Sequence, residues 1–568
     1  MARDLPRNDE VAEQFELLAD LLELEGAESF RVLAYRRAAA RMREETGAVA
    51  KLALEGRAKD LPGVGKTIEG KIVQIVEDGE IHALRERRER TPADVLAFMR
   101  LPGLGPKTAR RIWQDLGITS LEELKEAASA ERLRKLSGLG AKTEENVLRA
   151  LAAEPVGPPR TLLGTALPAL EAVVSVLRDH PACDRVSEAG SARRRTETVR
   201  DLDIIATASD PAELTGYLTH LTWVAEVVAK GQTKATVVSH DGLRFDLRVV
   251  PPEAYGNLLQ HFTGSKEHNV ALREEAVRRG LSVSEYGVVR VDDGSVSTAR
   301  TEEELYGSLG YAFIPPELRE NRGELEAARQ GDLPSLIEPG DLRGDLHSHT
   351  TWSADGHAGI EEMALAARER GYEYLAVTDH SHYLRDGRFE AQTEEIGTVN
   401  RRLAPFRVLR GVEVNIRADG SLDLDEKLLA GCDWVMASVH SNLASDLTSR
   451  VLAAMESPHV DCIGHLTGRR INHRPPGQVD LERVVAKALE TGTFLEINSQ
   501  PDRLDLRDSD ARFAGEAGVK IVVSSDAHRL DTLAYVELGV GQARRAWLTK
   551  EQILNTRPWP EVERLLKR

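Results

Sequence analysis

The chain has 568 residues, of which 41% are hydrophobic and 29% charged, so a single hydrophobic core is excluded and a soluble multidomain protein is expected. No apolar run approaches the roughly 20 residues of a membrane span, and no apolar signal segment follows the charged N-terminus, so we expect a cytoplasmic protein without a membrane partner. The formal net charge of −17 argues weakly against a nucleic-acid partner, although the first 150 residues are close to neutral.

Residues 10–150 carry apolar residues at helical spacing, which predicts a mostly helical region. One short pattern recurs there as LPGVGKTIEGKI (61–72), LPGLGPKTARRI (101–112) and LSGLGAKTEENV (136–147). Its glycines permit a tight turn, and the next helix begins with free N–H groups suited to a phosphate oxygen. One copy could be a packing turn without a ligand, whereas three copies resemble the helix-hairpin-helix motif, which binds the DNA backbone. The glycines are Gly63, Gly65, Gly103, Gly105, Gly138 and Gly140.

Residues 162–250 follow a Pro/Gly-rich linker (152–160) and alternate helical with β-rich runs, which predicts an α+β domain around a sheet. Asp201 and Asp203 stand two positions apart in one predicted strand, so their side chains share a face, and Asp246 lies in a later apolar strand. Converging carboxylates repel one another unless cations lie between them, which favours two Mg²⁺ or Mn²⁺ ions. The alternative for Asp-x-Asp alone is a solvated strand edge.

The segment before these aspartates contains groups that suit a phosphate. Gly190 allows close backbone approach, Ser191 offers a hydroxyl, and Arg194 offers a guanidinium fork. Together with the carboxylates they indicate a site where two metal ions activate a hydroxyl and stabilise a leaving phosphate.

The C-terminal part alternates strand-like and helical runs from residue 342 onward, after an apparent extended linker at 314–341. This alternation predicts an α/β barrel-like or doubly wound domain. Nine potential metal ligands follow its strand-like runs, and strand ends of a barrel meet at one rim, so one multinuclear metal centre for phosphate-ester hydrolysis is expected. A lone histidine is more often structural than a ligand. The nine are His347, His349, Asp355, His380, Glu413, His440, His465, Asp526 and His528.

The order of the hairpins, GSARRR, DLD, FDLRVV and HFTGSKEHN resembles the family X DNA polymerases. With the metal ligands attached, the chain resembles the bacterial form, which is fused to a polymerase-and-histidinol-phosphatase (PHP) domain. The resemblance covers essentially the whole chain and implies a multidomain α+β and α/β fold. Its implied parts are an N-terminal helical lyase-like domain (1–80), a fingers-like helical domain (81–152), a nucleotidyltransferase palm (161–250), a thumb (251–320), a linker (321–341) and a distorted β/α barrel (342–568).

The resemblance assigns roles at the polymerase site. Asp201, Asp203 and Asp246 match the catalytic carboxylates, with Asp246 expected to help activate the primer 3′-hydroxyl. Ser191 and Arg194 match residues that hold the incoming triphosphate.

In the thumb, the resemblance implies that Asn269 contacts the nucleotide base edge and Arg273 the template side. Lys266 stands where vertebrate relatives have an aspartate and is expected to bind nucleotide or template. His261-Phe262 replaces their Tyr-Phe, at the position that screens the sugar 2′-hydroxyl, so relaxed discrimination against ribonucleotides is expected.

A lyase function is implied for the first hairpin. Lys71 matches the family's Schiff-base lysine, and Tyr35 matches an aromatic residue that lines its site. Arg31 and Thr67 stand where animal members have supporting lysines, and the alternative is that Lys71 contacts backbone phosphate.

For the barrel, the resemblance implies up to three Mn²⁺ or Zn²⁺ ions, with Glu413 bridging two of them. Nine ligands in the family's order favour an active centre, associated in this group with Mn²⁺-dependent 3′→5′ exonuclease or 3′-end processing, and sometimes abasic-site cleavage. The implied sets are His347, His349 and Asp526 for one ion, His440 and His465 for its bridged neighbour, and Asp355, His380 and His528 for the third.

The resemblance thus predicts a DNA repair polymerase that fills short gaps, with gapped or nicked DNA and dNTPs as partners and a monomer on DNA. Two alternatives stay open: a small-molecule phosphoesterase with a decayed nucleotidyltransferase, and a non-catalytic scaffold that binds DNA ends.

Overall fold

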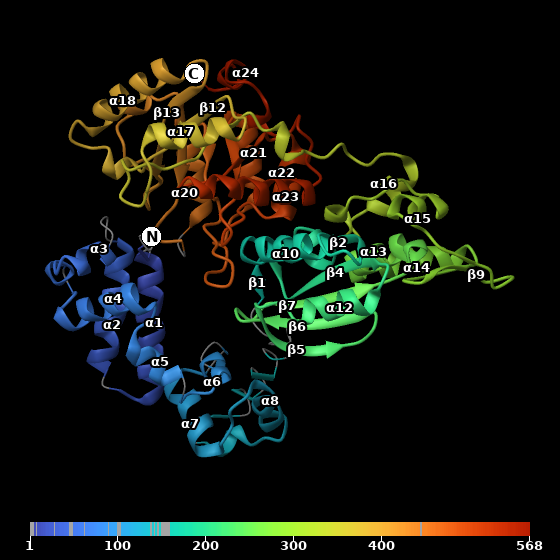
Figure 1. Cartoon of the computed structure of the whole chain (residues 1–568). Coiled ribbons are helices and arrows are strands. Elements are labelled where there is room, and N and C mark those ends of the chain that lie inside the picture. The colour runs from blue at the N-terminus through green and yellow to red at the C-terminus, as the bar shows by residue number, and fades with distance from the viewer. Residues whose placement is uncertain are drawn as a thin grey trace. The chain divides into compact units, whose positions relative to one another are not determined.

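The computed structural model describes residues 5–567 except 7, 28, 45–48, 62, 89, 99–100, 102–103, 137–138, 141–142, 145–146, 149–150, 152–159 and 444–445. The chain divides into two compact units, Met1–Pro158 and Pro159–Arg568 (Figure 1). Within the described residues, no helix combines the length and the apolar character needed to cross a membrane.

The regular structure described in the first unit is helical, which confirms the predicted fold class for this region. Its helices are α1 (Asn8–Glu25), α2 (Ser29–Glu44), α3 (Val49–Leu54), α4 (Lys66–Asp78), α5 (His82–Arg88), α6 (Ala93–Phe98), α7 (Pro106–Leu116) and α8 (Leu121–Ser129), with 3-10 turns η1 (Ala58–Asp60) and η2 (Leu133–Lys135). Two apolar cores hold them together: one joins α1, α2 and α4, and the other joins α6, α7 and α8.

The second unit begins with a five-stranded mixed sheet. In sheet order its strands are β2 (Cys183–Glu188), β4 (Asp201–Ala208), β7 (Arg244–Val249), β6 (Lys234–Ser239) and β5 (Val224–Lys230). The accompanying elements are α10 (Leu163–Arg178), α11 (Gly190–Arg193), α12 (Pro211–Thr219) and the short pair β1 (Thr161–Leu162) and β3 (Thr198–Val199). Leu202 and Ile204 of β4 join the core formed with α10 and α12, so the alternating aspartates of β4 face the other side of the sheet.

A smaller α/β part follows the sheet. It contains η3 (Pro252–Ala254), α13 (Tyr255–Thr263), α14 (Lys266–Arg278), β8 (Leu281–Ser284), β9 (Gly287–Arg290), β10 (Val296–Ser297), α15 (Glu302–Ser308) and η4 (Pro316–Leu318). The segment 314–341, predicted as an extended linker, instead contains α16 (Glu324–Gln330) and η5 (Pro339–Asp341). Glu324 and Ile337 are fully buried, so contacts with both neighbouring parts hold this segment in place.

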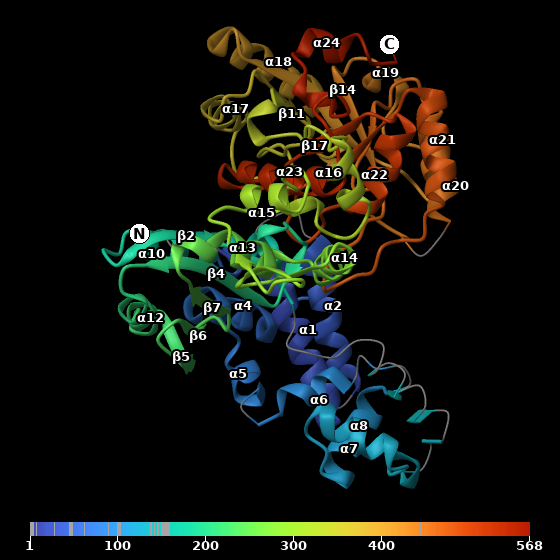
Figure 2. The same cartoon turned by 90° about the vertical axis from the view of Figure 1, so that its right-hand side faces the viewer.

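The remainder forms a sheet of seven parallel strands with helices around it, which confirms the predicted β/α barrel. The strands are β11 (Gly344–Asp345), β12 (Tyr374–Val377), β13 (Arg407–Asn415), β14 (Trp434–Ser438), β15 (Cys462–Ile463), β16 (Phe494–Asn498) and β17 (Ile521–Ser524). The helices are α17 (Ile360–Glu369), η6 (Ser381–Tyr383), α18 (Arg388–Leu403), α19 (Glu426–Leu429), α20 (Leu447–Met455), α21 (Leu481–Thr491), α22 (Asp508–Ala517), η7 (Asp531–Tyr535), α23 (Val536–Arg545), η8 (Leu554–Thr556) and α24 (Trp559–Glu563). Figure 2 shows α23 on the side of the barrel that faces the mixed sheet.

Side chains of alternate strand positions fill the barrel interior. Its lower layer is apolar and includes Tyr374, Trp434 and Phe494, closed off by Trp559 of α24. Two periods further along the strand, the inward position is polar, as with Glu413 four residues after Leu409. The carboxyl ends of the strands therefore surround a polar rim above an apolar floor.

Two candidate metal centres

All seven barrel strands bring a polar side chain to this rim. The contributions are His347 and His349 after β11, His380 after β12, Glu413 in β13, His440 after β14, His465 after β15, Glu496 in β16, and Asp526 and His528 after β17. Asp355 comes from the loop after β11. The nine residues predicted as ligands are thus brought together by the strand register, because parallel strands end at the same edge.

Glu413 lies at the middle of this group and is almost fully buried. Its Oε1 is 3.6 Å from His347 Nε2, 3.3 Å from His440 Nε2 and 3.0 Å from His465 Nε2, and its Oε2 is 3.6 Å from His349 Nε2 and 2.8 Å from His380 Nδ1. Burial opposes ionisation of Glu413, but the histidines, His440 and His380 foremost, hold its pKa well below the usual range. One carboxylate with five imidazoles around it has the arrangement of a bridging ligand.

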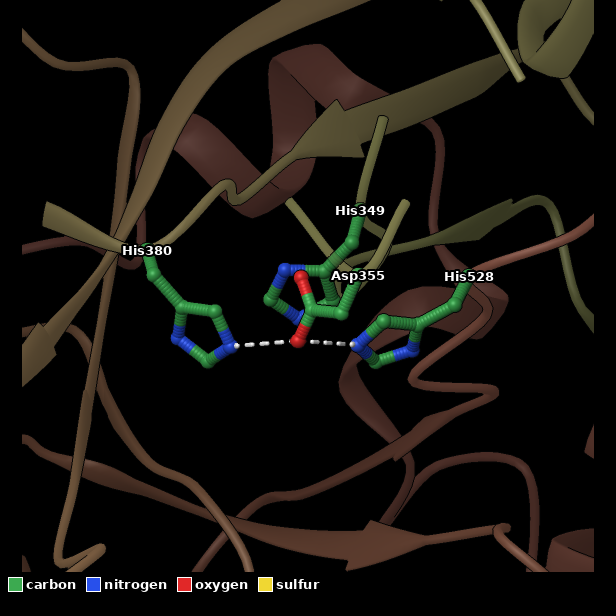
Figure 3. Close-up of side chains that lie close together, drawn as sticks. All are labelled: His349, Asp355, His380 and His528. Atoms are coloured by element: carbon green, nitrogen blue, oxygen red, sulfur yellow. Dashed lines mark ion pairs between the residues drawn. The ribbon is translucent and has the colours of Figure 1, made fainter. Parts of the chain in front are cut away.

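Two further carboxylates flank Glu413. Asp526 Oδ1 lies 3.5 Å from His347 Nε2 and 3.2 Å from His349 Nε2. Figure 3 shows Asp355 between two rings, with Oδ2 3.3 Å from His380 Nε2 and 3.4 Å from His528 Nε2. The groups whose donor atoms lie within 4.8 Å of one another are His347, His349 and Asp526; His349, Asp355, His380 and His528; and His380, Glu413 and His440. His349 and His380 each belong to two groups, so the division of ligands among ions stays a prediction.

Several buried ring nitrogens at the rim make no well-directed hydrogen bond with a described residue, although carboxylate oxygens lie near some of them. They are Nε2 of His347, both nitrogens of His349, Nδ1 of His380 and Nδ1 of His465. Burying such nitrogens unpaired costs free energy, and divalent cations would pair with them. Burial and the neighbouring His528 and His380 lower the pKa of His349 to about 3, so its ring is the neutral form that binds metal. The residues therefore fit metal ions.

A second set of residues, which sequence analysis missed, orients these side chains. The bonds are His347 Nδ1 to Glu496 (2.7 Å), His440 Nδ1 to Asn415 Oδ1 (2.6 Å) and Asn498 Nδ2 to Asp526 Oδ2 (2.9 Å). Partners of this kind fix the tautomer and direction of a ligand. The signal for Glu496 was a lone charge inside the apolar strand FLEIN, at an inward position.

The mixed sheet carries the second centre. The parallel register of β4 and β7 places Asp203 directly opposite Asp246, two positions along from Asp201. Arg244 Nε lies 3.0 Å from Asp246 Oδ2 and 3.6 Å from Asp201 Oδ1, and the Thr236 hydroxyl donates to Asp246 Oδ1. The three predicted carboxylates thus meet on one face.

Asp203 is the innermost of the three. Burial, then the charges of Asp246 and Asp201, raise the pKa of Asp203 to about 7. Gly190 lies against it with φ +65°, and a Cβ there would fall 2.2 Å from Asp203 Oδ2. A divalent cation would relieve the repulsion among these carboxylates, so this donor set also fits metal ions.

The predicted phosphate-binding residues lie at the edge of this centre. Ser191 is in α11, and Arg194 ends it. Arg194 Nη1 donates to the Thr263 carbonyl (2.5 Å) and its Nε to Glu320 (3.1 Å), so the guanidinium joins α11 to the end of α13.

Three predicted contacts share one face of α14. Asn269 Nδ2 donates to the His261 carbonyl, and Arg273 Nη2 lies 2.8 Å from His261 Nδ1. Lys266 stands one turn earlier and is exposed. Asn269 and Arg273 therefore both contact His261, which precedes Phe262.

The glycines of the hairpins lie where helices begin. Gly65 caps α4 and Gly105 caps α7, and Gly63 adopts φ +84° in the turn. A Cβ at Gly63, Gly65, Gly105 or Gly140 would meet no atom of the described residues within 4 Å, which leaves room for a close external approach. Gly103 and Gly138 lie outside the described residues.

Lys71 and Tyr35 differ in exposure. Lys71 in α4 is half-buried, and burial together with the charges of Arg31 and Arg87 lowers its pKa. Tyr35 is 5% exposed, with its ring centroid 5.9 Å from that of Phe15, so it packs in the core.

Models of four known families match parts of the chain. They are the helix-hairpin-helix domain (residues 6–81), the SAM-like helix-hairpin-helix tandem (95–153), the DNA polymerase beta thumb (258–320) and the PHP domain (345–500). The chain is also 38% identical over 568 residues to the DNA polymerase/3′-5′ exonuclease PolX of Bacillus subtilis (strain 168), covering 97% of this chain and 98% of that protein.

The chain belongs to the bacterial family X DNA polymerases with a PHP domain. Shorter relatives resemble part of this family X chain. A probable phosphatase of Thermoanaerobacter sp. (strain X514) is 31% identical over 225 residues, 37% of this chain and 89% of that protein. Another, of Photobacterium profundum, is 34% identical over 196 residues, 32% of this chain and 77% of that protein. In the family X chain the parallel barrel continues past the PHP match, since β17, Asp526 and His528 follow residue 500.

Proposed function

We propose that the chain is a DNA repair polymerase that fills short gaps at the mixed sheet and processes 3′ ends at the barrel rim. As a member of its family it is a DNA polymerase with a 3′–5′ exonuclease and it binds DNA; the proposal assigns each activity to a site. The observation that carries it is the presence of two centres that share no residue: three carboxylates on β4 and β7, and nine candidate ligands that include Glu413.

At the polymerase site, Asp201, Asp203 and Asp246 would hold two Mg²⁺ or Mn²⁺ ions, which would favour the ionised primer 3′-hydroxyl and stabilise the departing pyrophosphate. Asp246 would accept the proton of that hydroxyl, and the Thr236 hydroxyl fixes its orientation. Gly190 lets the backbone approach the phosphates closely.

The incoming nucleotide would lie between α11 and α14. Ser191 and Arg194 would bind the triphosphate, Arg194 by exchanging its bonds to Thr263 and Glu320. Lys266, Asn269 and Arg273 would contact the nucleotide and template, with His261-Phe262 beneath the sugar.

At the barrel rim, the nine ligands would hold up to three Mn²⁺ or Zn²⁺ ions, which would supply hydroxide at neutral pH and neutralise charge on the scissile phosphate. Glu413 would bridge two ions, while Glu496, Asn415 and Asn498 keep the ligands aimed inward.

In the first unit, we assign Lys71 to a deoxyribose-phosphate lyase or abasic-site cleavage. Its lowered pKa would leave more free amine to attack the opened sugar, and Tyr35 would support the site from the core. The hairpin glycines would accept the DNA backbone.

The proposed domain boundaries follow the same assignment: lyase-like (1–80), fingers-like (81–152), palm (161–250), thumb (251–320), linker (321–341) and PHP (342–568). Its partners would be gapped or nicked DNA and dNTPs, bound by one copy of the chain.

The test uses a 5′-labelled primer in a one-nucleotide gap with Mn²⁺, with and without dNTPs. We expect extension with dNTPs and 3′ shortening without them. Asp203→Ala should abolish only extension, and His347→Ala only shortening. Normal extension by Asp203→Ala would refute the palm assignment, and normal shortening by His347→Ala would refute the rim assignment.

A second candidate, a small-molecule phosphoesterase, is favoured by the similarity to probable phosphatases. A chromogenic phosphomonoester assayed beside single-stranded DNA separates the two. Faster turnover of the phosphomonoester would support this alternative, and DNA binding without any turnover would support the scaffold.

A further inference from the structure

Two loops that begin at the barrel rim carry four arginines. The first follows His465 at the end of β15, and the second follows Asn498 at the end of β16. Thr467 of the first loop donates through its backbone N–H (2.9 Å) and its hydroxyl (3.0 Å) to Asp505 of the second. Gln500 Nε2 donates to the carbonyl of Asp526 (2.7 Å), so both loops are fixed to the rim.

The first loop holds two arginines opposite each other. Arg470 and Arg474 form a β-bridge, closed by Arg470 N–H to Arg474 O (2.9 Å) and the reverse bond (2.7 Å). Like charges placed directly opposite each other destabilise a strand pair. Burial and the positive charges of Arg503 and Arg470 lower the pKa of Arg474, so Arg503 of the second loop belongs to the same cluster.

Among the described residues, Asp502 forms an ion pair with one arginine of this cluster. Arg470 Nε lies 2.6 Å from Asp502 Oδ2, but Arg474 donates to the Gly468 carbonyl. The Arg503 guanidinium makes no hydrogen bond or ion pair with a described residue. The fourth arginine, Arg469, is instead bound through both Nη atoms to Glu197 and is mostly buried. A bound anion would offset the repulsion among the guanidinium groups of Arg470, Arg474 and Arg503.

We propose that Arg470, Arg474 and Arg503 bind backbone phosphates of the DNA strand whose 3′ end enters the nine-ligand centre. Guanidinium groups suit phosphate oxygens, and contacts with the backbone act on any sequence, as an exonuclease requires. The cluster lies in the two loops that follow His465 and Asn498, and Gln500 of the second loop is bonded to Asp526, so the arginines would bind phosphates upstream of the scissile one. This inference rests on the assignment of the exonuclease to the barrel rim.

The first test measures binding without catalysis. Fluorescent single-stranded DNA is titrated in EDTA across a salt series with wild type, Arg503→Gln and Arg474→Gln/Arg503→Gln. Each lost phosphate contact is expected to reduce the slope of log affinity against log salt by about 0.7. Arg343→Gln is the matched control, because Arg343 precedes β11 at the opposite end of the barrel and its side chain is 45% exposed. Slopes equal to wild type in both cluster variants would overturn the proposal.

The second test measures Mn²⁺-dependent hydrolysis of a series from a dinucleotide to long oligonucleotides. In wild type, kcat/KM should rise as upstream phosphates reach the cluster. Arg503→Gln should flatten this rise, with roughly a five- to tenfold loss on long strands, and Arg503→Lys should restore most of it. An equal loss on every length would mean that the arginine supports the fold or the scissile phosphate, and would also overturn the proposal. Retained shortening by His347→Ala would refute the site assignment itself, whatever the arginine variants do.

Discussion

At the scale of single residues, Gly190 is a position that tolerates no side chain. Its φ of +65° and the 2.2 Å approach of an added Cβ to Asp203 Oδ2 leave no room for a side chain. Gly190→Ala should displace that carboxylate and lower primer extension on the order of 100-fold, since misplacing a catalytic group by about 1 Å costs that much. Exonuclease activity should persist.

Gly216→Ala in α12 is the control, because its added Cβ would meet only the Lys230 ammonium at 3.8 Å. Similar extension by both variants would contradict the role given to Asp203.

Asp203 also makes stability depend on pH. Its pKa of about 7 in the fold exceeds the ordinary value of about 3.9, so the folded state keeps a proton that the unfolded state has lost. Stability of the metal-free protein should therefore fall as pH rises from about 4 to about 7, and Asp203→Asn should remove that fall. Calorimetry in EDTA should show a Tm higher by a few degrees for Asp203→Asn above pH 7, and no gain near pH 4.

Asp201→Asn is the comparison variant. Because the Asp201 side chain is 42% exposed, this substitution should raise the Tm by less. In saturating Mn²⁺, wild type should have a higher Tm than Asp203→Asn, because the cation binds the carboxylate form of Asp203. A Tm gain independent of pH would contradict the ionisation argument.

The candidate site residues could be predicted from the sequence where a ligand type follows a recognisable strand. Asp201, Asp203 and Asp246 meet because side chains alternate between the two faces of a strand and because the register of β4 and β7 aligns these positions. The orienting residues Glu496 and Asn415 were missed, because an isolated carboxylate or amide carries no spacing signal until its partner is placed.

At the scale of elements, β16 shows what a strand without a predicted ligand contributes. Glu496 accepts bonds from His347 Nδ1 and the His465 N–H, both 2.7 Å long, and from the Ser524 hydroxyl. Glu496→Gln should weaken Mn²⁺ binding at the rim about 10- to 100-fold, because His347 loses its charged acceptor. Two measurements would detect this loss: the metal content of the protein after dialysis, and the rate of 3′ shortening.

Glu490→Gln is the matched control, since that side chain is 68% exposed on α21. Primer extension should be the same in both variants. Unchanged metal content in Glu496→Gln would contradict the orienting role.

The order of helices and strands could be predicted because their periodicities differ along the chain. The structure of segment 314–341 could not be predicted, since its Pro and Gly content indicates a linker. Its helix α16 is instead held by buried contacts such as His268 Nδ1 to Glu324 (2.6 Å). Those contacts join residues 56 positions apart, which local patterns do not register.

At the scale of the whole second unit, Arg545 of α23 connects the barrel to the palm. Arg545 donates to the Arg194 carbonyl (2.8 Å) and Glu320 (2.8 Å), and lies 2.9 Å from Asp508. Arg545→Met should cost about 3 kcal/mol or more, because it leaves buried carboxylates short of a partner. Calorimetry should show the lower stability, and KM for dNTP should rise, since Arg194 loses its anchor.

Arg300→Met is the control, because the Arg300 side chain is 70% exposed and lies 3.8 Å from Glu253, which is 57% exposed, so stability should change by about 0.5 kcal/mol or less. Equal stability of the two variants would show that Arg545 does not hold the palm and barrel together.

Such long-range pairs mark the limit of prediction from sequence. Arg469 and Glu197 are separated by 272 positions, and nothing near either residue indicates the other. Each domain can be expected from its own pattern, but the surfaces that join them depend on side chains whose pairing the fold alone determines.

The barrel closes through one parallel bridge, Ser348 to Ala527, among its described residues. The side chains on either side of this seam are His347 and His349 on one edge and Asp526 and His528 on the other. Any ion shared between them would link the first and last strands of the ring as a crosslink does. Chelation of the ions would then weaken the contact between the first and last strands as well as remove a cofactor. In the chelated protein, backbone amides along this seam should exchange with solvent faster than those of β13 and β14.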